Sequence, residues 1–364
     1  MSISKIHTIQ EKNCFIGIDL GGTSITIGVI DDDGKSLARI VIPTQPEDDK
    51  ETLIERLTEC IQSVIQEAKI SEKMVRRVGL ATPGTMDIPN GILICPSNLP
   101  RWRDFPIRDA LAESCGYPVT YAHDASSAAF GEYWMGAGKY EQGLILLTLG
   151  TGIGCGIVLN GHVWTGTHSH GGECGHNLID ITPNARWCNC GQRGHLEAYA
   201  SATGVIKRTC EMLDAGVTSS LTERVAAAEH RSNIPKIVCE EAKKGDKTAL
   251  AIVDETAYYL ACGLVSVIHT NDPSCILFGG AMTFGGKNHT IGRRFLNKIK
   301  KEVYSRIFVY LAERIRIDYA ELGSKAGYLG VAGLARQDWY QSLETAQTSL
   351  KPKCRPQKSV VSVR

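Results

Sequence analysis

The sequence predicts an α/β protein made of two units, each of which begins with short strands around a glycine-rich turn. The 364 residues are more than one hydrophobic core commonly serves, so we expect two domains. Short apolar runs typical of strands alternate with longer segments whose apolar residues recur every three or four positions. Glycine-rich turns lie at 19–23 and again at 150–156, although the two halves are alike in plan only.

The first unit opens as an antiparallel meander of three strands. Short Gly/Asp turns separate the mostly apolar runs at 14–20, 25–30 and 37–42, as in hairpin-connected strands. The segment 51–68 then changes to the three- and four-residue period of an amphipathic helix. The other expected elements of this unit are two short buried strands and the helix between them, at 78–81, 119–122 and 108–114.

The second unit starts at Asp124, where helices and strands begin to alternate again. We expect strands at 144–150, 156–159, 275–278 and 315–319. We expect helices at 124–136, 198–213, 248–268, 293–303 and 325–335. From 351 the chain is basic and contains proline and serine, so we expect disorder at this end.

Composition places the chain among ordinary soluble globular proteins, with 43% hydrophobic and 22% charged residues. The net charge of +1 gives no overall field that would favour a nucleic acid or a membrane as partner. The N-terminus lacks the apolar core of a signal peptide, and we expect no membrane-spanning run of about 18 to 20 apolar residues. We therefore expect a cytoplasmic protein whose 13 cysteines are reduced thiols, some of them at a metal site, and not a disulfide framework.

The first glycine-rich turn, Asp19-Leu20-Gly21-Gly22-Thr23, has the residues of a phosphate-binding loop. Two adjacent glycines let the backbone approach a phosphate closely and offer main-chain N–H groups as donors. The Asp19 carboxylate can hold Mg²⁺ through water, and the Thr23 hydroxyl can donate to a phosphate oxygen. An ordinary hairpin turn is the alternative.

The second glycine-rich turn places glycine at alternate positions between two apolar runs, with Gly150, Thr151, Gly152 and Gly154 at its centre. Glycine inside a strand pair weakens it, and this usually indicates that a ligand approaches the backbone closely. A bulged hairpin is the alternative. The pattern is not a dinucleotide-binding fingerprint, because Cys155 stands where the third glycine would be required.

A cluster of soft metal ligands follows. Cys188, Cys190 and His195 lie within eight positions, and His176 can supply a fourth ligand for a tetrahedral zinc ion. Cys174 is a possible substitute for His176. Glycines inside the segment favour the sharp turns that a short chelating loop needs, while reduced thiols in a loop are the alternative.

His123 and Asp124 are predicted to lie where a strand ends and a helix begins. A carboxylate at such a place can accept a proton from a substrate hydroxyl. The alternative is that Asp124 only caps the helix.

Taken together, these residues resemble the ROK family of bacterial repressors and sugar kinases. The most specific part is 171–201, which contains Glu-x-Gly-His at 173–176 and Cys-x-Cys-Gly-x-x-Gly-x-x-Glu at 188–197, followed by Tyr-Ala-Ser. The resemblance extends from about 15 to 335 and implies an actin-like, ribonuclease-H-like fold with two α/β domains around a central cleft. The implied parts are an N-terminal extension at 1–13, a small domain at 14–122 with a C-terminal helix at 324–337, a large domain with the zinc loop at 123–323, and a disordered basic tail at 338–364.

The resemblance also implies a role for each motif. Asp124 matches the catalytic base. The residues that match the sugar pocket are Gly84, Asn98, His123, Asp124, Glu173, His176 and Glu197. Those that match the nucleotide and phosphate site are Asp19, Gly21, Gly22, Thr23, Gly150, Thr151, Gly152, Gly154, Gly279 and Gly280. The matching zinc ligands are His176, Cys188, Cys190 and His195, so that zinc is structural and fixes the sugar ligand His176.

Two positions depart from the family pattern. His123 stands where the family usually has an asparagine that contacts the sugar, and imidazole is bulkier with a different set of donors. His195 stands where the fourth zinc ligand is usually cysteine, and zinc accepts either. The first departure affects which sugar we expect more than which reaction.

The activity implied by the resemblance is ATP- and Mg²⁺-dependent phosphorylation of a hexose hydroxyl, in the first place glucose to glucose 6-phosphate, by a homodimer. N-acetylmannosamine, N-acetylglucosamine and fructose stay open as substrates, and polyphosphate as a donor. A transcriptional repressor is one rival, although the first strand starts too early for an N-terminal helix-turn-helix domain. A non-catalytic sugar-responsive regulator is the other, and it would need neither Asp124 nor the glycine loops.

Overall fold

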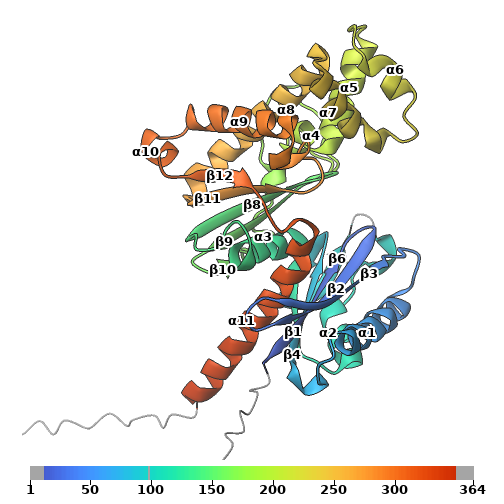
Figure 1. Cartoon of the computed structure of the whole chain (residues 1–364), viewed down its shortest axis with the longest axis vertical. Coiled ribbons are helices and arrows are strands. Elements are labelled where there is room, and N and C mark those ends of the chain that lie inside the picture. Colours follow the sequence, from blue (N-terminus) through green and yellow to red (C-terminus); the bar gives the residue numbers. More distant parts are fainter. Residues whose placement is uncertain (1–11, 97–98, 350–364) are drawn as a thin grey trace, which may run out of the picture.

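The computed structural model describes residues 12–96 and 99–349 (Figure 1). It contains two α/β domains, each built on a five-stranded sheet that combines parallel and antiparallel neighbours. This architecture confirms the predicted fold class. Six short 3₁₀ turns connect the elements of the described residues. They lie at Glu72–Met74, Pro100–Trp102, Cys174–His176, Arg231–Asn233, Gly286–Asn288 and Gly323–Lys325.

The N-terminal domain contains the expected meander, extended by two parallel strands. Its strands are β1 (Cys14–Leu20), β2 (Ser24–Asp31), β3 (Ser36–Pro43), β4 (Val75–Thr82) and β7 (Val119–His123), in the order β3-β2-β1-β4-β7. Its helices are α1 (Lys50–Glu67) and α2 (Ile107–Cys115), and a small hairpin joins β5 (Thr85–Asp87) to β6 (Ile92–Cys95). Helix α1 begins where Asp49 accepts a hydrogen bond from the Thr52 N–H at 2.8 Å, and its apolar face is buried against the sheet.

The second domain has the sheet order β10-β9-β8-β11-β12. Its strands are β8 (Gly143–Leu149), β9 (Ile153–Leu159), β10 (His162–Val163), β11 (Cys275–Gly279) and β12 (Arg316–Tyr319). Its helices are α4 (Glu197–Ala200), α5 (Ala202–Asp214), α6 (Leu221–Ala226), α7 (Ile234–Lys244), α8 (Lys247–Asn271), α9 (Thr290–Tyr304) and α10 (Val309–Ala312). Helix α8 is long and apolar enough to span a membrane, but more than half of its most apolar stretch is buried in the domain core.

Two helices join the domains. Helix α3 (Asp124–Met135) lies between the two sheets, and α11 (Ala326–Ser349) crosses it and continues along the N-terminal sheet (Figure 1). Glycines make the close crossings possible: a Cβ at Gly330 would lie 1.6 Å from the Ser127 carbonyl oxygen, and one at Gly17 would lie 1.9 Å from the Tyr328 carbonyl oxygen. The two sheets are therefore tied together by tightly packed helices.

Two expectations about elements need correction, and some elements were not predicted. The single helix expected at 198–213 is two helices, because Ser201 is extended and its hydroxyl accepts from the Gly204 N–H at 3.2 Å, which starts α5. The disordered tail expected from 338 is wrong for 338–349, because α11 continues to Ser349; residues 350–364 lie outside the described part of the chain. The elements that were not predicted are β5, β6, β10, α6, α7 and α10.

Candidate active site

Asp124 is the first residue of α3 and directly follows β7. Its Oδ1 accepts a hydrogen bond from the Ala125 N–H at 2.6 Å and lies 3.3 Å from His123 Nδ1. The helix N-cap position belongs to His123, whose side chain makes no capping hydrogen bond, while the Asp124 carboxylate accepts from an N–H of the first turn. The side chain of Asp124 is 39% exposed, which leaves the carboxylate accessible to a substrate.

A second carboxylate, that of Asp19, lies near Asp124 at the end of β1. Burial and the negative charge of Asp124 raise the pKa of Asp19 to about 7. The carboxylate lies against the first turn of α11, where a Cβ at Gly327 would be 2.1 Å from Asp19 Oδ2. Glycine at 327 therefore makes room for Asp19.

The first glycine-rich turn is the tight connection between β1 and β2. Gly21 donates to the Ser24 carbonyl at 3.0 Å and accepts from the Thr44 hydroxyl at 2.7 Å. Gly22 and Thr23 are exposed at its tip. The local structure is therefore the hairpin turn given as the alternative. Its tip is exposed, so a phosphate could still reach its backbone N–H groups.

The second glycine-rich turn, between β8 and β9, packs on the start of α5. The Gly150 carbonyl accepts from the Ala202 N–H at 2.9 Å, and the Thr151 carbonyl accepts from the Thr203 hydroxyl at 2.8 Å. Apart from Gly150 and its two neighbours in the chain, no atom of the described residues lies within 4 Å of the position where Gly150 would carry a Cβ. This face of the loop is open to a ligand.

The remaining glycines of this turn approach protein atoms. A Cβ at Gly152 would lie 2.3 Å from Glu197 Oε2, which accepts from the Ile153 N–H at 3.0 Å. A Cβ at Gly154 would lie 2.5 Å from Thr148 Oγ1 and 3.1 Å from the Ala125 Cβ. The alternating glycines therefore bring the loop against Glu197 on one side and the start of α3 on the other, which the sequence alone did not predict.

The turn at Gly279 and Gly280 lies against this loop. Gly280 has a φ of +89°, and a Cβ there would be 2.3 Å from the Leu149 carbonyl oxygen, which also accepts from the Met282 N–H at 2.9 Å. A pocket of about 650 Å³ lies beside both turns. It is lined by Gly150, Thr151, Ala202, Thr203, Ile206, Ser232, Asn233, Pro235, Lys236, Cys239, Glu240, Ala281, Met282, Phe284, Gly285 and His289.

Helix α7 supplies a wall of this pocket that was not predicted from the sequence. Helix α7 begins with Pro235 in its first turn, a common first-turn residue that was not recognised as a start signal. Its buried positions 234, 237, 238 and 241 have the helical period that could have revealed it.

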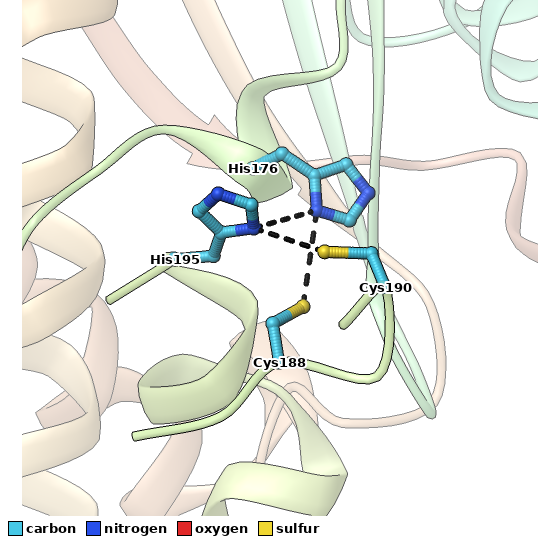
Figure 2. Close-up of side chains that lie close together, drawn as sticks. All are labelled: His176, Cys188, Cys190 and His195. Carbon is cyan, nitrogen blue, oxygen red and sulfur yellow. Dashed lines mark hydrogen bonds between the residues drawn. The ribbon is translucent and has the colours of Figure 1, made fainter. Parts of the chain in front are cut away.

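The four predicted zinc ligands converge (Figure 2). Their ligand atoms all lie within 4.8 Å of one another, with 3.3 Å between the Nδ1 atoms of His176 and His195 and 3.2 Å between Cys190 Sγ and His195 Nδ1. Zinc bonds of about 2.0 to 2.3 Å place tetrahedral ligand atoms about 3.3 to 3.8 Å apart, so the cluster fits zinc. Burial and the neighbouring His176 lower the pKa of His195, which favours the neutral, metal-binding imidazole.

Cys174, the alternative fourth ligand, is not part of this cluster. Its side chain is buried beside Cys155 of β9. The cysteines of the described residues are all free, in agreement with the expected thiols.

The expected sugar ligands lie on both sides of the metal cluster. Glu173 Oε2 is 3.9 Å from His176 Nε2, and Glu197 Oε1 is 3.5 Å from Cys188 Sγ. Gly84 has a φ of +95°, and a Cβ there would lie 2.6 Å from the Pro96 Cα. Asn98 lies outside the described residues.

Contacts connect these groups into one region. Glu197 touches the metal cluster and the second glycine loop, and that loop touches the helix that begins with Asp124. Across the domains, the Ile88 N–H of the β5–β6 hairpin donates to the Ser169 hydroxyl at 3.0 Å, a few residues before Glu173. A carboxylate, a histidine of the candidate zinc cluster and two glycine loops are thus gathered where the two domains meet.

Comparison with known proteins gives the context of this site. The sequence model of the ROK family matches residues 15–338. The chain belongs to the ROK family. The cluster of His176, Cys188, Cys190 and His195 is consistent with the zinc motif of the family. The fold of the chain is that of the actin-like ATPases.

Relatives of this ROK protein cover nearly its whole length. A glucokinase of Thermotoga maritima is 34% identical over 90% of this chain and 99% of its own. A ROK hexokinase from Thermus thermophilus has a TM-score of 0.76 at 30% identity, covering 91% of this chain and 99% of that one. A ROK family glucokinase from Streptomyces griseus, in complex with glucose and AMPPNP, has a TM-score of 0.70 at 30% identity and covers 89% and 100%. More distantly, a xylose repressor of Caldicellulosiruptor bescii is 26% identical over 90% of this chain and 79% of its own.

Proposed function

We propose that this ROK protein is an ATP-dependent hexose kinase, with glucose as the first candidate substrate and glucose 6-phosphate as its product. The observation that carries the proposal is the position of Asp124: a partly exposed carboxylate at the start of α3, on the helix that the second glycine loop touches. A non-catalytic sugar-binding protein would need no such base. The glucokinases and the hexokinase among its relatives support the same activity.

Asp124 is the proposed general base. Phosphoryl transfer depends on alignment and on neutralising charge more than on covalent chemistry by the protein. The carboxylate would orient the reacting sugar hydroxyl, expected to be the 6-OH, and accept its proton as the phosphoryl group arrives. Such a base contributes about 10²- to 10⁴-fold in rate.

The nucleotide would bind on the side of the second glycine loop. The 650 Å³ pocket has the size of a small-ligand site, and its apolar side chains Ile206, Met282 and Phe284 suit a purine base. The open face of Gly150 can take the phosphates. Mg²⁺ would neutralise phosphate charge when bound, and Asp19 would hold it through water. A pocket for a base favours ATP over polyphosphate.

The sugar would bind on the side of the metal cluster. Glu173 and Glu197 offer carboxylate acceptors for ring hydroxyls, and His176 lies between Glu173 and the cluster. The four side chains would hold a structural zinc ion, which would fix the ring of His176. His123, beside Asp124, departs from the family pattern. We therefore expect it to influence the choice among glucose, fructose and the N-acetylhexosamines.

The test is a coupled assay of ADP release over glucose, mannose, fructose, N-acetylglucosamine and N-acetylmannosamine, with ATP and, separately, polyphosphate as donor. We expect turnover with ATP and at least one hexose, glucose first. Tight sugar binding without turnover by any donor would instead favour a sugar-responsive regulator, the role suggested by the repressors among its distant relatives.

A further inference from the structure

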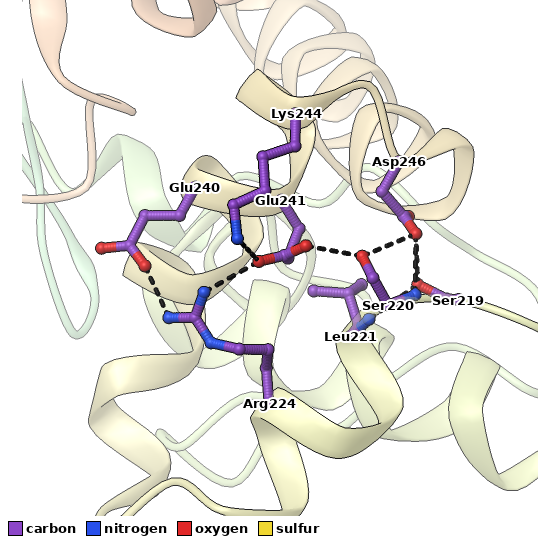
Figure 3. Close-up of polar contacts among 8 residues, drawn as sticks. All are labelled: Ser219, Ser220, Leu221, Arg224, Glu240, Glu241, Lys244 and Asp246. Atoms are coloured by element: carbon purple, nitrogen blue, oxygen red, sulfur yellow. Dashed lines mark hydrogen bonds and ion pairs between the residues drawn. The ribbon is translucent and has the colours of Figure 1, made fainter.

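Two glutamates of the described residues are buried, and their charges are compensated in different ways. The Glu241 side chain, 4% exposed, belongs to a network of charged and hydroxyl groups (Figure 3). Arg224 Nη1 and Lys244 Nζ both lie 2.8 Å from Glu241 Oε1. The Ser220 hydroxyl donates to the other oxygen at 2.6 Å. Two cations therefore offset the cost of burying this carboxylate.

Glu132, near the end of α3, is fully buried and is compensated by backbone groups instead. Its Oε2 accepts from the Ala137 N–H at 2.9 Å, and both of its oxygens accept from the Glu321 N–H, at 3.0 and 3.1 Å. Its Oε1 also accepts from the Leu322 N–H at 2.7 Å. Hydrogen bonds to the charged form replace the water that a buried carboxylate has lost. The carboxylate therefore fixes the three backbone groups that it binds.

These backbone groups lie beside the two places where the chain passes between the domains (Figure 1). Ala137 follows the end of α3, and α3 itself begins directly after β7 of the N-terminal sheet. Glu321 and Leu322 lie in the connection from β12 of the second sheet to α11, which packs along the N-terminal sheet. Glu132 thus holds the second passage to the helix that begins at the first.

The two acidic residues of the candidate active site lie on, or against, the helices that this carboxylate holds together. Asp124 is the first residue of α3, and Asp19 lies against the first turn of α11, where a Cβ at Gly327 would be 2.1 Å from Oδ2. Between these points the helices touch: a Cβ at Gly131 would be 2.3 Å from the Ala326 carbonyl oxygen. A shift of α11 along α3 would therefore move Asp19 relative to Asp124.

We propose that Glu132 is a positioning residue for phosphoryl transfer; this rests on the proposed kinase function. Its carboxylate holds the β12–α11 connection against α3, and so sets the position of Asp19 relative to the proposed base Asp124. Glu132 is buried away from both substrates, so its effect on the rate passes through these two residues. Misplacing reacting groups by about 1 Å can cost about a hundredfold in rate, even when the change is remote from the chemistry.

The test is a double-mutant cycle in the kinetics of hexose phosphorylation at saturating ATP. The value of kcat is taken per sugar-binding site, counted by calorimetric titration with the same hexose, so that unfolded protein does not enter it. Glu132→Gln keeps the size of the side chain but replaces one acceptor oxygen by an amide donor. It should lower kcat at least about tenfold and change the sugar affinity by less than about threefold. In an Asp124→Asn background the same substitution should lower the rate by less than about threefold, because the base that it positions is already lost.

Two further variants separate positioning from stability. Glu241→Gln is the matched control: it also removes a buried carboxylate of the second domain, but one that binds neither passage, and it should keep the wild-type kcat per site. Gly136→Ala displaces the Glu132 carboxylate without removing its charge, because a Cβ there would be 2.1 Å from Oε2. Its φ of −115° is open to alanine, and we expect kcat per site to fall in this variant too.

Several outcomes would overturn the proposal. Wild-type kcat per site in either Glu132→Gln or Gly136→Ala excludes a positioning role, and so does an equal fall in the wild-type and Asp124→Asn backgrounds. An equal fall in Glu241→Gln would make the effect one of stability alone. If Glu132→Gln does not fold, the same cycle with Gly136→Ala decides. These results leave the kinase function standing, whereas a wild-type protein that phosphorylates no hexose contradicts both proposals.

Discussion

At the scale of single residues, Asp19 and Asp124 show how two nearby carboxylates acquire different properties. Asp124 keeps an exposed carboxylate, whereas burial and the charge of Asp124 raise the pKa of Asp19 to about 7. In the unfolded chain an aspartate titrates near pH 4. Between these two values the folded protein binds one more proton at Asp19 than the unfolded chain does, so this group makes the protein less stable as the pH rises.

Asp19→Asn should therefore stabilise the metal-free protein at pH 8, because the variant has no buried charge to hold. A change of one in pKa is worth about 1.4 kcal/mol, so we expect a gain of at least about 1 kcal/mol in the free energy of unfolding. The gain should shrink as the pH falls towards 4, because below that pH the side chain becomes neutral in both states. Urea unfolding between pH 4 and pH 8 measures it, and a gain that does not change with pH would contradict the assignment.

His123 is a proposed sugar-site residue at which the sequence departs from the expected family pattern. Its Nδ1 faces Asp124 Oδ1 at 3.3 Å, and its side chain is 20% exposed. If the ring also contacts the sugar, His123→Asn should keep activity and shift the preference among hexoses by about tenfold, far below the 10⁴-fold of a fully unpaired polar group. The measurement is kcat/KM for glucose, mannose and the two N-acetylhexosamines. Unchanged ratios across the four sugars would show that His123 does not read the substrate.

The cluster of four candidate zinc ligands was predictable from the sequence, but the pocket wall that α7 supplies was not. A short chelating loop needs several ligands and glycines close together in the chain, so Cys188, Cys190 and His195 form a visible pattern. Glu240 is one glutamate on a helix whose apolar period was not recognised, and only the fold places it at a pocket.

At the scale of elements, the loop that carries Cys188, Cys190 and His195 packs against the second glycine-rich turn through Glu197. Glu197 follows the metal loop directly, and Gly152 leaves the space that its carboxylate fills. Sequence reasoning predicted strands, glycine turns and ligand residues, because these depend on local patterns. The space that Gly154 leaves for α3 was not predicted, because it depends on a contact distant in the chain. The N-cap at Ser201 was missed although its hydrogen bond from the Gly204 N–H is local.

We expect the purified protein to carry about one zinc ion per chain. His195→Cys should keep the ion, since thiolate replaces imidazole as a ligand. His195→Ala should lose it and lower kcat/KM for the sugar at least about tenfold, because His176 is no longer held. Metal analysis and sugar kinetics on the same preparations give the comparison. Full activity in a zinc-free His195→Ala protein would show that the cluster does not support the sugar site.

At the scale of the whole molecule, the crossing of α3 and α11 joins the two sheets. Gly330→Ala would place a methyl group about where the Ser127 carbonyl oxygen lies, 1.6 Å from the ideal Cβ position. We expect a loss of about 1 to 3 kcal/mol in the free energy of unfolding. Gln341→Ala, at an exposed position of the same helix, is the control and should change stability little. A Gly330→Ala protein as stable as the control would contradict the packing described for this crossing.

The two-domain plan could be predicted from the sequence, because length and alternating patterns depend on the chain as a whole. The joining of the domains could not, since Gly17, Gly79 and Gly330 read as ordinary glycines until the path of α11 is known. The end of α11 was also missed, because nothing in the local pattern after 337 separates a solvated helix from a tail.

The central claim is that Asp124 serves the transfer of a phosphoryl group to a hexose. The most direct test is phosphorus NMR of the products formed from ATP and glucose by the wild-type protein and by Asp124→Asn, which keeps the size of the side chain but cannot accept the proton. We predict a sugar 6-phosphate ester with the wild-type protein and a rate at least about a hundredfold lower with the variant, at similar glucose affinity. Ester formation at the wild-type rate by Asp124→Asn, or no phosphate ester from the wild-type protein with any hexose, would contradict the account.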